Sequence, residues 1–159
     1  MPFDHAALTQ GLDREIAAVR AFIDLLRKEQ SALTCGENDR IAEFAEAKAR
    51  HLLELTRYSD ERSRWLAGLG VSSDRAGMDR VLREQAGAAV APRRAWNQLL
   101  QLTQIAQQTN TTNGMLISAR LNHTQRALNA IFSAARLPGA YGADGGTVSL
   151  RTAQHLAVA

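Results

Sequence analysis

The side chains that could carry chemistry are scattered along this chain. Its four histidines, at positions 5, 51, 123 and 155, lack the spacing of metal ligands, and its single cysteine, Cys35, falls in a predicted turn. His51 and Glu54 lie one helical turn apart, but two groups do not make a metal site, and a solvated helix surface accounts for both. The glycine-rich segment 142–146 follows no predicted strand and lacks the lysine of a phosphate-binding loop. We therefore expect no enzyme activity, no metal and no cofactor.

The composition favours helices. The chain has 159 residues, enough for one domain with its own core, and it is 45% hydrophobic but only 5% aromatic. Alanine, leucine, glutamine, glutamate and arginine dominate, and these residues favour helix over sheet. Only Pro2, Pro92 and Pro138 interrupt the chain, so long stretches between them can be continuous helix. The composition therefore predicts an all-α fold.

Apolar residues recur every three or four positions along three long stretches, a coiled-coil-like pattern. This spacing predicts helices at about 4–34, 39–66 and 92–135, with a short helix at 74–85. Asp4 is expected to cap the first helix, Gly36 to end it, and Asn38 or Asp39 to cap the second. The short turn between the first two helices requires them to run antiparallel. We expect an antiparallel bundle of three long helices plus the short one.

Two basic residues, Lys48 and Arg62, fall within the apolar stripe of the second helix. Long basic side chains often lay their stems on apolar surface and keep their charged ends in water. We favour this interpretation over a buried functional charge.

The longest helix carries an unusual polar sequence, Asn110-Thr-Thr-Asn113-Gly114. Gly114 could end one helix before a turn, or the helix could run through it at a cost of about 1 kcal/mol. The apolar stripe keeps its phase across this site, so we expect one continuous helix. Asn110 and Asn113 would then face the interior of the bundle, where a buried asparagine fixes helix register at some cost in stability.

The character of the chain changes after residue 136. Residues 137–146 contain four glycines and one proline, which predicts a flexible linker. Residues 147–159 regain apolar side chains and form either a frayed tail or a segment that folds on binding. We therefore divide the chain into a helical bundle domain, 1–136, and a flexible C-terminal tail, 137–159.

The charge is unevenly distributed. Residues 1–74 carry ten Lys/Arg and thirteen Asp/Glu, whereas residues 75–159 carry nine and three, and no carboxylate lies between Glu84 and Asp144. The few arginines there form a thin stripe, so we favour a basic helix beside acidic ones over nucleic-acid binding. No apolar run approaches the roughly 18 residues of a membrane span, and the first residues do not resemble a secretory signal. We expect a cytoplasmic protein without stable membrane insertion.

Several landmarks occur in a characteristic order. They are Leu26-Arg-Lys-Glu29, Leu33, Gly36, Lys48 before Leu52-Leu53, Arg62 before Trp65-Leu66, Gly70, Trp96, Asn110-Thr-Thr-Asn113-Gly114, Tyr141-Gly142 and Gly145. This order resembles the FlgN family of flagellar type III export chaperones, from about Leu8 to Gly146. The Asn-x-x-Asn-Gly element and the downstream Tyr-Gly are the most specific parts, and residues 147–159 match no family pattern.

The resemblance implies a cytoplasmic chaperone for the hook-associated proteins of the hook–filament junction. It would keep these proteins unpolymerised and deliver them to the cytoplasmic domain of the export gate. The family binds its cargo largely through the C-terminal region, where an aromatic residue takes part in docking to the gate, and Tyr141 matches that residue.

We assign cargo binding to apolar residues between positions 117 and 156. They are Ile117, Leu121, Leu128, Ile131, Val148, Leu150 and Leu156. The alternative is a helical coiled-coil scaffold or regulatory protein with no export role, whose hallmark would be self-association. The sequence leaves open which junction protein is bound and whether the chain also forms a weak homo-oligomer.

Overall fold

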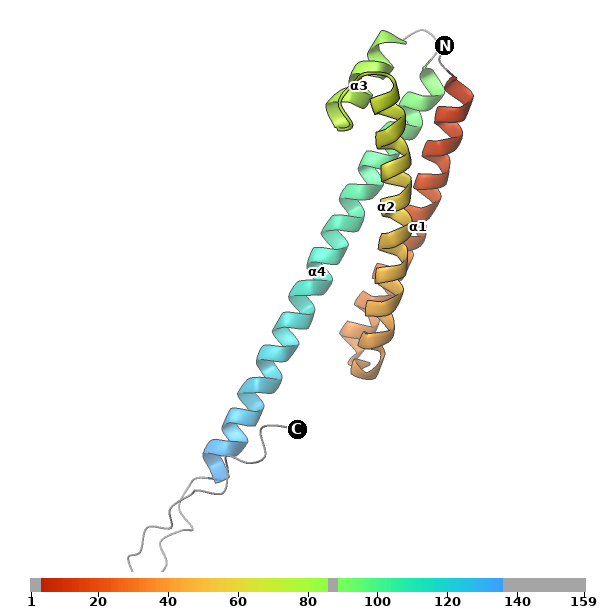
Figure 1. The fold of residues 1–159 in the computed structure, drawn as a ribbon. Helices are drawn as coiled ribbons and strands as arrows, with labels where there is room; N and C mark the ends of the chain where they lie inside the picture. The colour runs from red at the N-terminus through yellow and green to blue at the C-terminus, as the bar shows by residue number, and fades with distance from the viewer. Residues whose placement is uncertain (1–3, 86–88, 136–159) are drawn as a thin grey trace, which may run out of the picture. The chain divides into compact units, whose positions relative to one another are not determined.

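The computed structural model describes residues 4–85 and 89–135, and these residues are helical apart from short connections (Figure 1). The elements are α1 (His5–Cys35), a 3₁₀ turn η1 (Asn38–Arg40), α2 (Ile41–Gly68), α3 (Arg75–Glu84) and α4 (Val90–Ala135). The described part of the chain contains no strand. The predicted all-α class and the order of three long helices and one short helix are confirmed.

Local residue chemistry explains the ends of α1. The Asp4 side chain accepts hydrogen bonds from the amides of Ala6 and Ala7 at 3.0 and 2.9 Å, which satisfies two donors that an isolated helix start would leave unpaired. Gly36 ends the helix with φ 87°, a left-handed conformation that glycine adopts without a steric penalty. Both predicted boundaries of α1 are therefore confirmed.

The start of α2 differs from the prediction. Neither Asn38 nor Asp39 caps this helix, because both belong to η1, and the N-cap position is Arg40, whose side chain makes no capping bond. The physical reason is that the 3₁₀ turn leads directly into α2, with the amide of Ile41 donating to the carbonyl of Asn38. The backbone of the turn thus replaces the side-chain cap that the sequence suggested.

A compact turn connects α2 to α3. Gly70 has φ 71°, and Asp74 caps α3 by accepting from the amide of Gly77 at 2.9 Å and the hydroxyl of Ser72 at 2.7 Å. The hydrogen bond from Gly77, followed by that from Ser72, lowers the pKa of Asp74 because both favour the carboxylate form. The short helix predicted at 74–85 is therefore confirmed, with Asp74 as its N-cap.

The fourth helix runs without interruption through Gly114. Its 46 residues correspond to about 70 Å at the α-helical rise. Pro92 lies in its first turn, where a missing amide costs nothing, and its side chain is fully buried. The prediction of one continuous helix is confirmed.

The core lies along α1, whose buried face runs from Leu8 to Leu33. Residues of α2, α3 and the first half of α4 pack against it, including Leu66, Met78 and Leu99. Antiparallel packing of α1 and α2 is visible in Figure 1, and α4 begins at the same end as α1. In the first unit, α1 and α4 therefore run in the same direction and α2 runs antiparallel to both, around one hydrophobic core.

Packing divides the chain into a compact unit of residues 1–119 and a second unit of residues 120–159. The described part of the second unit is the end of α4, and every side chain from 121 to 133 is exposed. None of the helices described here is long and apolar enough to cross a membrane.

Candidate protein-binding surfaces

One polar layer ties together the three long helices. Glu29 of α1 is only 2% exposed, and both of its carboxylate oxygens accept from Lys48 Nζ of α2 at 3.2 Å. Asn113 of α4 is fully buried and donates through Nδ2 to Glu29 Oε2 and to the carbonyl of Leu26, both at 2.8 Å. Asn113 therefore faces the interior, as predicted, and holds α4 against α1.

A second polar layer lies two heptads away on both α1 and α2. Arg62 makes a two-pronged ion pair with Glu15 at 3.1 Å, and its guanidinium lies 5.2 Å from the ring centre of Trp96. The indole of Trp96 in turn donates to Asp79 of α3 at 2.9 Å. This layer therefore connects all four α-helices.

These layers correct the interpretation of Lys48 and Arg62. Their side chains are only 20% and 18% exposed, and their charged ends pair with buried glutamates instead of lying in water. Because a buried carboxylate without a partner is costly, each basic residue compensates a charge that α1 brings into the core. These ion pairs fix the register of α1 against α2.

The predicted inward position of Asn110 is wrong, since its side chain is exposed. Near residue 113, α4 makes its polar contacts with α1, so only a narrow face of α4 is buried there. Ala106 and Asn113, seven residues apart, occupy that face, and Asn110 lies outside it.

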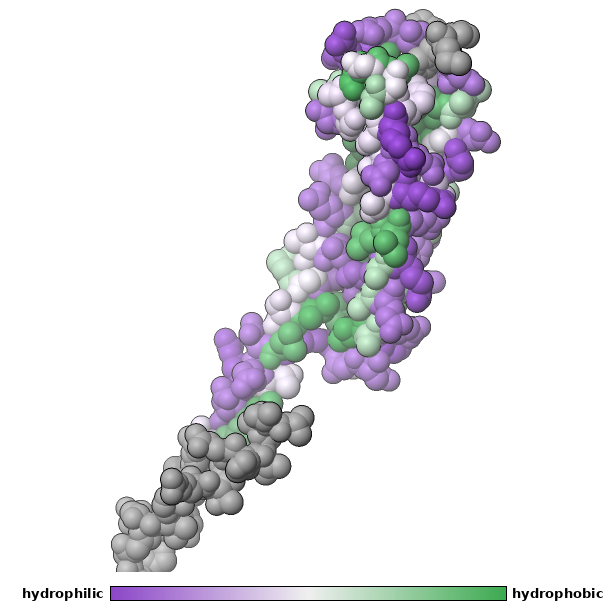
Figure 2. Space-filling model, in the orientation of Figure 1, coloured by the Kyte–Doolittle hydropathy of each residue, from purple (hydrophilic) through white to green (hydrophobic). Residues whose placement is uncertain are grey.

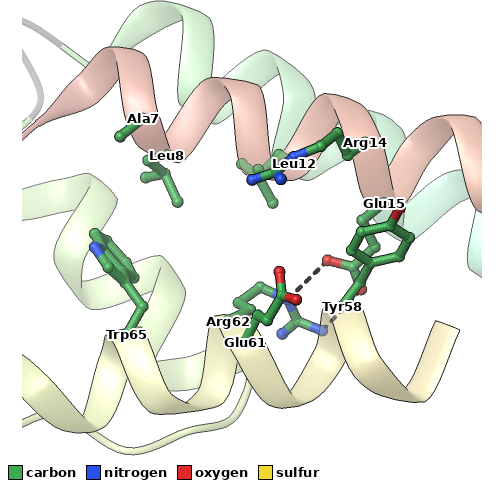
Figure 3. Close-up of a pocket in the computed structure, with 10 residues that line it drawn as sticks. Ala7, Leu8, Leu12, Arg14, Glu15, Tyr58, Glu61, Arg62 and Trp65 are labelled. Carbon is green, nitrogen blue, oxygen red and sulfur yellow. Dashed lines mark hydrogen bonds and ion pairs between the residues drawn. The ribbon is translucent and has the colours of Figure 1, made fainter. Parts of the chain in front are cut away.

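A small pocket lies between the first turns of α1 and the last turns of α2 (Figure 3). Its volume is about 160 Å³, and Leu8 and Leu12 of α1 face Tyr58, Arg62 and Trp65 of α2 across it. This is smaller than the sites that hold cofactors, which occupy roughly 300–1,000 Å³.

A larger groove of about 350 Å³ lies between α2 and α4. Leu52 and Leu55 of α2 form one wall, and Leu99 and Leu100 of α4 form the other. Glu15 and Val19 of α1 also line it, with Thr56, Ser59, Arg62, Trp96 and Thr103. No cluster of three or more potential metal ligands occurs among the residues of 4–85 and 89–135.

The end of α4 presents an apolar stripe. Leu121, Leu128 and Ile131 are 66%, 42% and 64% exposed, and their spacing places them on one helix face. Phe132, 62% exposed, borders this face. Arg126 lies on the same segment, which contains no carboxylate. An uncovered stripe of this kind is typical of a surface that binds another helix.

The sequence profile of the FlgN family, described as "FlgN protein", matches residues 1–149. The chain belongs to the FlgN family. The resemblance noted from about Leu8 to Gly146 is thereby confirmed.

A curated relative of this FlgN-family chain is the "Flagella synthesis protein FlgN" of Proteus mirabilis. The two are 28% identical over 140 residues, which is 87% of this chain and 88% of the relative. No solved structure gives a significant match.

The predicted cargo-binding residues of this FlgN-family chain fall into two groups. Leu121, Leu128 and Ile131 share the exposed stripe, whereas Ile117 is half-buried and belongs to the first unit. The remaining predicted residues, namely Val148, Leu150, Leu156 and the gate-docking Tyr141, lie outside the described residues.

Two features of the surface are not predicted by the sequence pattern. Phe132 borders the predicted stripe. The sequence pattern does not single it out, because it falls outside the series of apolar residues spaced three or four positions apart. The groove between α2 and α4 depends on how two distant helices are placed, so no local signal predicts it.

Proposed function

We propose that this chain takes part in flagella synthesis as a cytoplasmic, non-catalytic export chaperone. It binds terminal helices of hook-associated proteins, keeps them from polymerising prematurely and delivers them to the cytoplasmic domain of the flagellar export gate. Membership of the FlgN family and the name of the Proteus mirabilis relative support the flagellar role.

The observation that best supports the chaperone activity is the uncovered stripe of Leu121, Leu128 and Ile131. A polymerising subunit must keep its amphipathic terminal helices from pairing too early, and another helix with an exposed apolar face can cover them. Each large apolar side chain that leaves water contributes about 1.5–3 kcal/mol before ordering costs. Three or four such side chains suit reversible binding, since ordering a cargo segment costs several kcal/mol.

The charge of this segment supports a specific kind of cargo helix. Arg126 lies near the stripe, and no carboxylate occurs between Glu84 and Asp144. A cargo helix with acidic residues beside its apolar face therefore fits this surface best, and its association is expected to slow at high salt.

Substitutions on α4 test the cargo surface. Leu128→Glu places a charge in the stripe and should weaken binding of a hook-associated terminal fragment at least tenfold, or about 1.4 kcal/mol, by titration calorimetry. Asn122→Glu adds the same charge on another face of the exposed segment and serves as the control. Equal affinities of the two variants would contradict this placement of the site.

Deletion of residues 137–159 tests the contribution of the C-terminal tail. We expect the truncated chain to keep its helical content and to lose cargo binding. Full cargo affinity in the truncated chain would exclude Val148, Leu150 and Leu156 from the binding site.

Delivery to the gate is tested separately through Tyr141→Ala. This substitution should weaken pull-down of the gate's cytoplasmic domain and leave cargo affinity nearly unchanged. Undiminished pull-down would remove the assigned role of Tyr141.

A coiled-coil scaffold without an export role is the alternative, because an exposed heptad stripe can also pair with a second copy. Light scattering of the purified chain distinguishes the two. An obligate oligomer that buries Leu128 would favour the scaffold.

A further inference from the structure

The groove between α2 and α4 is a second uncovered apolar surface, and it belongs entirely to the first unit. Leu52 is 50% exposed there, although it lies on a helix that packs against α1. Leu55 and Leu100 are half-buried at the groove walls. Figure 2 shows a hydrophobic patch over the middle of α2, with hydrophilic side chains on either side. Within residues 1–119, the described chain thus leaves an apolar furrow between two of its long helices.

The residues that line this groove carry no net charge. Its only ionisable lining residues are Glu15 and Arg62, which neutralise each other through their 3.1 Å ion pair. On the α4 side, no Asp, Glu, Lys, Arg or His occurs from Ala95 to Ala119. The polar residues along this stretch are mostly glutamine, threonine and asparagine. A charged partner residue would therefore lose hydration here without gaining an opposite charge.

The arrangement of the walls suits a helix. The α2 residues that line the groove run from Leu52 to Arg62, about three helical turns, and those of α4 run from Trp96 to Thr103. Two helices flank the groove, and a third contributes Glu15 and Val19 to its lining, so an added helix would complete a four-helix bundle. The aliphatic residues on the walls provide the holes into which its side chains would pack.

We propose that this groove binds an amphipathic helix of a partner protein whose docking face is aliphatic and uncharged. This site is separate from the stripe of Leu121, Leu128 and Ile131. The proposal therefore does not depend on whether that stripe binds export cargo. The two surfaces differ in electrostatics. Binding in the neutral groove is insensitive to salt, whereas binding beside Arg126 depends on salt.

The probe is a synthetic stapled helix of 18 residues with Leu and Ala at its a and d positions and Gln or Ser elsewhere. A second peptide has Lys in place of the Gln residues that flank the seam, and a third has Glu. Methyl NMR of the full chain follows the leucine signals. We expect the neutral peptide to shift Leu52, Leu55, Leu99 and Leu100, and to bind at least tenfold more tightly than either charged peptide. Its Kd should change less than about twofold between 50 and 500 mM salt.

Two pairs of variants locate the site. Leu52→Glu places a charge in the groove, whereas Leu53→Glu places it at the neighbouring position, which is 74% exposed and outside the groove. Thr103→Arg and Gln101→Arg form a similar pair on α4, and both positions are exposed, so neither substitution threatens folding. Only Leu52→Glu and Thr103→Arg should reduce binding of the neutral peptide, by at least tenfold.

Three results would overturn the proposal. The first is that the NMR signals of the groove leucines do not shift at about 1 mM neutral peptide. The second is that both variants of a pair lose the same affinity for that peptide, and the third is that a charged peptide binds more tightly than the neutral one. A second copy of the chain as occupant would appear as concentration-dependent light scattering that Leu52→Glu abolishes, and this result would likewise reject a partner helix.

Discussion

Asn113 places one buried side-chain amide between α4 and α1, and its hydrogen bonds hold the two helices together. Its Nδ2 serves two acceptors on α1, the carbonyl of Leu26 and the carboxylate of Glu29, while Lys48 approaches the same carboxylate from α2. The Oδ1 atom of Asn113 is buried and accepts no hydrogen bond from the described residues. The unpaired Oδ1 atom costs stability, whereas the buried asparagine favours one register among the three helices.

Removing Lys48 should expose the cost of the buried carboxylate. Lys48→Met leaves Glu29 without its cation, and we expect a loss of about 2–3 kcal/mol in the free energy of unfolding, moderated because water reaches Lys48. Urea denaturation measures this change. The double variant Glu29→Gln/Lys48→Met should recover most of the loss, because no buried charge remains and the glutamine carbonyl can still accept from Asn113. A double variant as unstable as Lys48→Met would show that the lysine acts through packing alone.

Gly114 follows Asn113 but needs none of glycine's special properties. It lies within α4 without a positive φ, and a Cβ at this position would meet nothing within 4 Å. Gly114→Ala should therefore stabilise the protein by about 0.5–1 kcal/mol through helix propensity and a less flexible unfolded chain. Thermal denaturation provides the measurement. A lower Tm would show that the chain needs flexibility at this point of α4.

Among the elements, α3 depends most on one close contact. It is a ten-residue helix that supplies Met78, Val81 and Leu82 to the core and Asp79 to the indole of Trp96. Its first turn lies so close to the preceding loop that a Cβ on Gly77 would clash with the carbonyl oxygen of Ser72. Backbone approaches backbone here, so no side-chain rearrangement can relieve the contact.

Gly77→Ala should consequently destabilise the protein, by about 2 kcal/mol as for other overpacked sites. Near-ultraviolet circular dichroism of Trp96 should change as well, since α3 carries its hydrogen-bond acceptor. Gly68→Ala is the matched control, because a Cβ at that helical position meets nothing within 4 Å. If Gly77→Ala proved as stable as Gly68→Ala, the loop would have to be able to move away from α3.

At the scale of the whole molecule, the two parts of α4 differ in tertiary support. Before residue 120, the inner face of α4 contributes Trp96, Leu99 and Ala106 to the hydrophobic core. From 121 to 133 every side chain is exposed. A helical segment of about 15 residues without tertiary packing is only marginally stable in water, so this end of α4 should open more easily than the packed part.

Hydrogen exchange should reveal this difference directly. Amides of α1 and of α4 before residue 107 should exchange through global unfolding, whereas those from 121 to 135 should exchange by local opening, many times faster. Saturation with a cargo fragment should slow exchange selectively in 121–135. Uniform protection along α4 of the free chain would mean that the stripe is already covered.

Much of this fold could be predicted from the sequence because helix formation is a local property. The spacing of apolar residues, the caps at Asp4 and Asp74, Gly36 at the end of α1 and the continuous phase through Gly114 all act within a few residues of chain. Family landmarks could be recognised for the same reason. The same periodicity predicts the apolar stripe of Leu121, Leu128 and Ile131 on α4.

Only the tertiary structure decided which partners the interior residues meet. The same stripe pattern contained Asn110 and Asn113, yet only Asn113 is buried, because burial depends on how much of α4 its neighbours cover. Pairing of Lys48 with Glu29 and of Arg62 with Glu15 required the register of two antiparallel helices. The neutral groove likewise arises where α2 and α4, distant in sequence, line one furrow. Periodicity specifies the face of each helix, but the distances between helices specify what that face contacts.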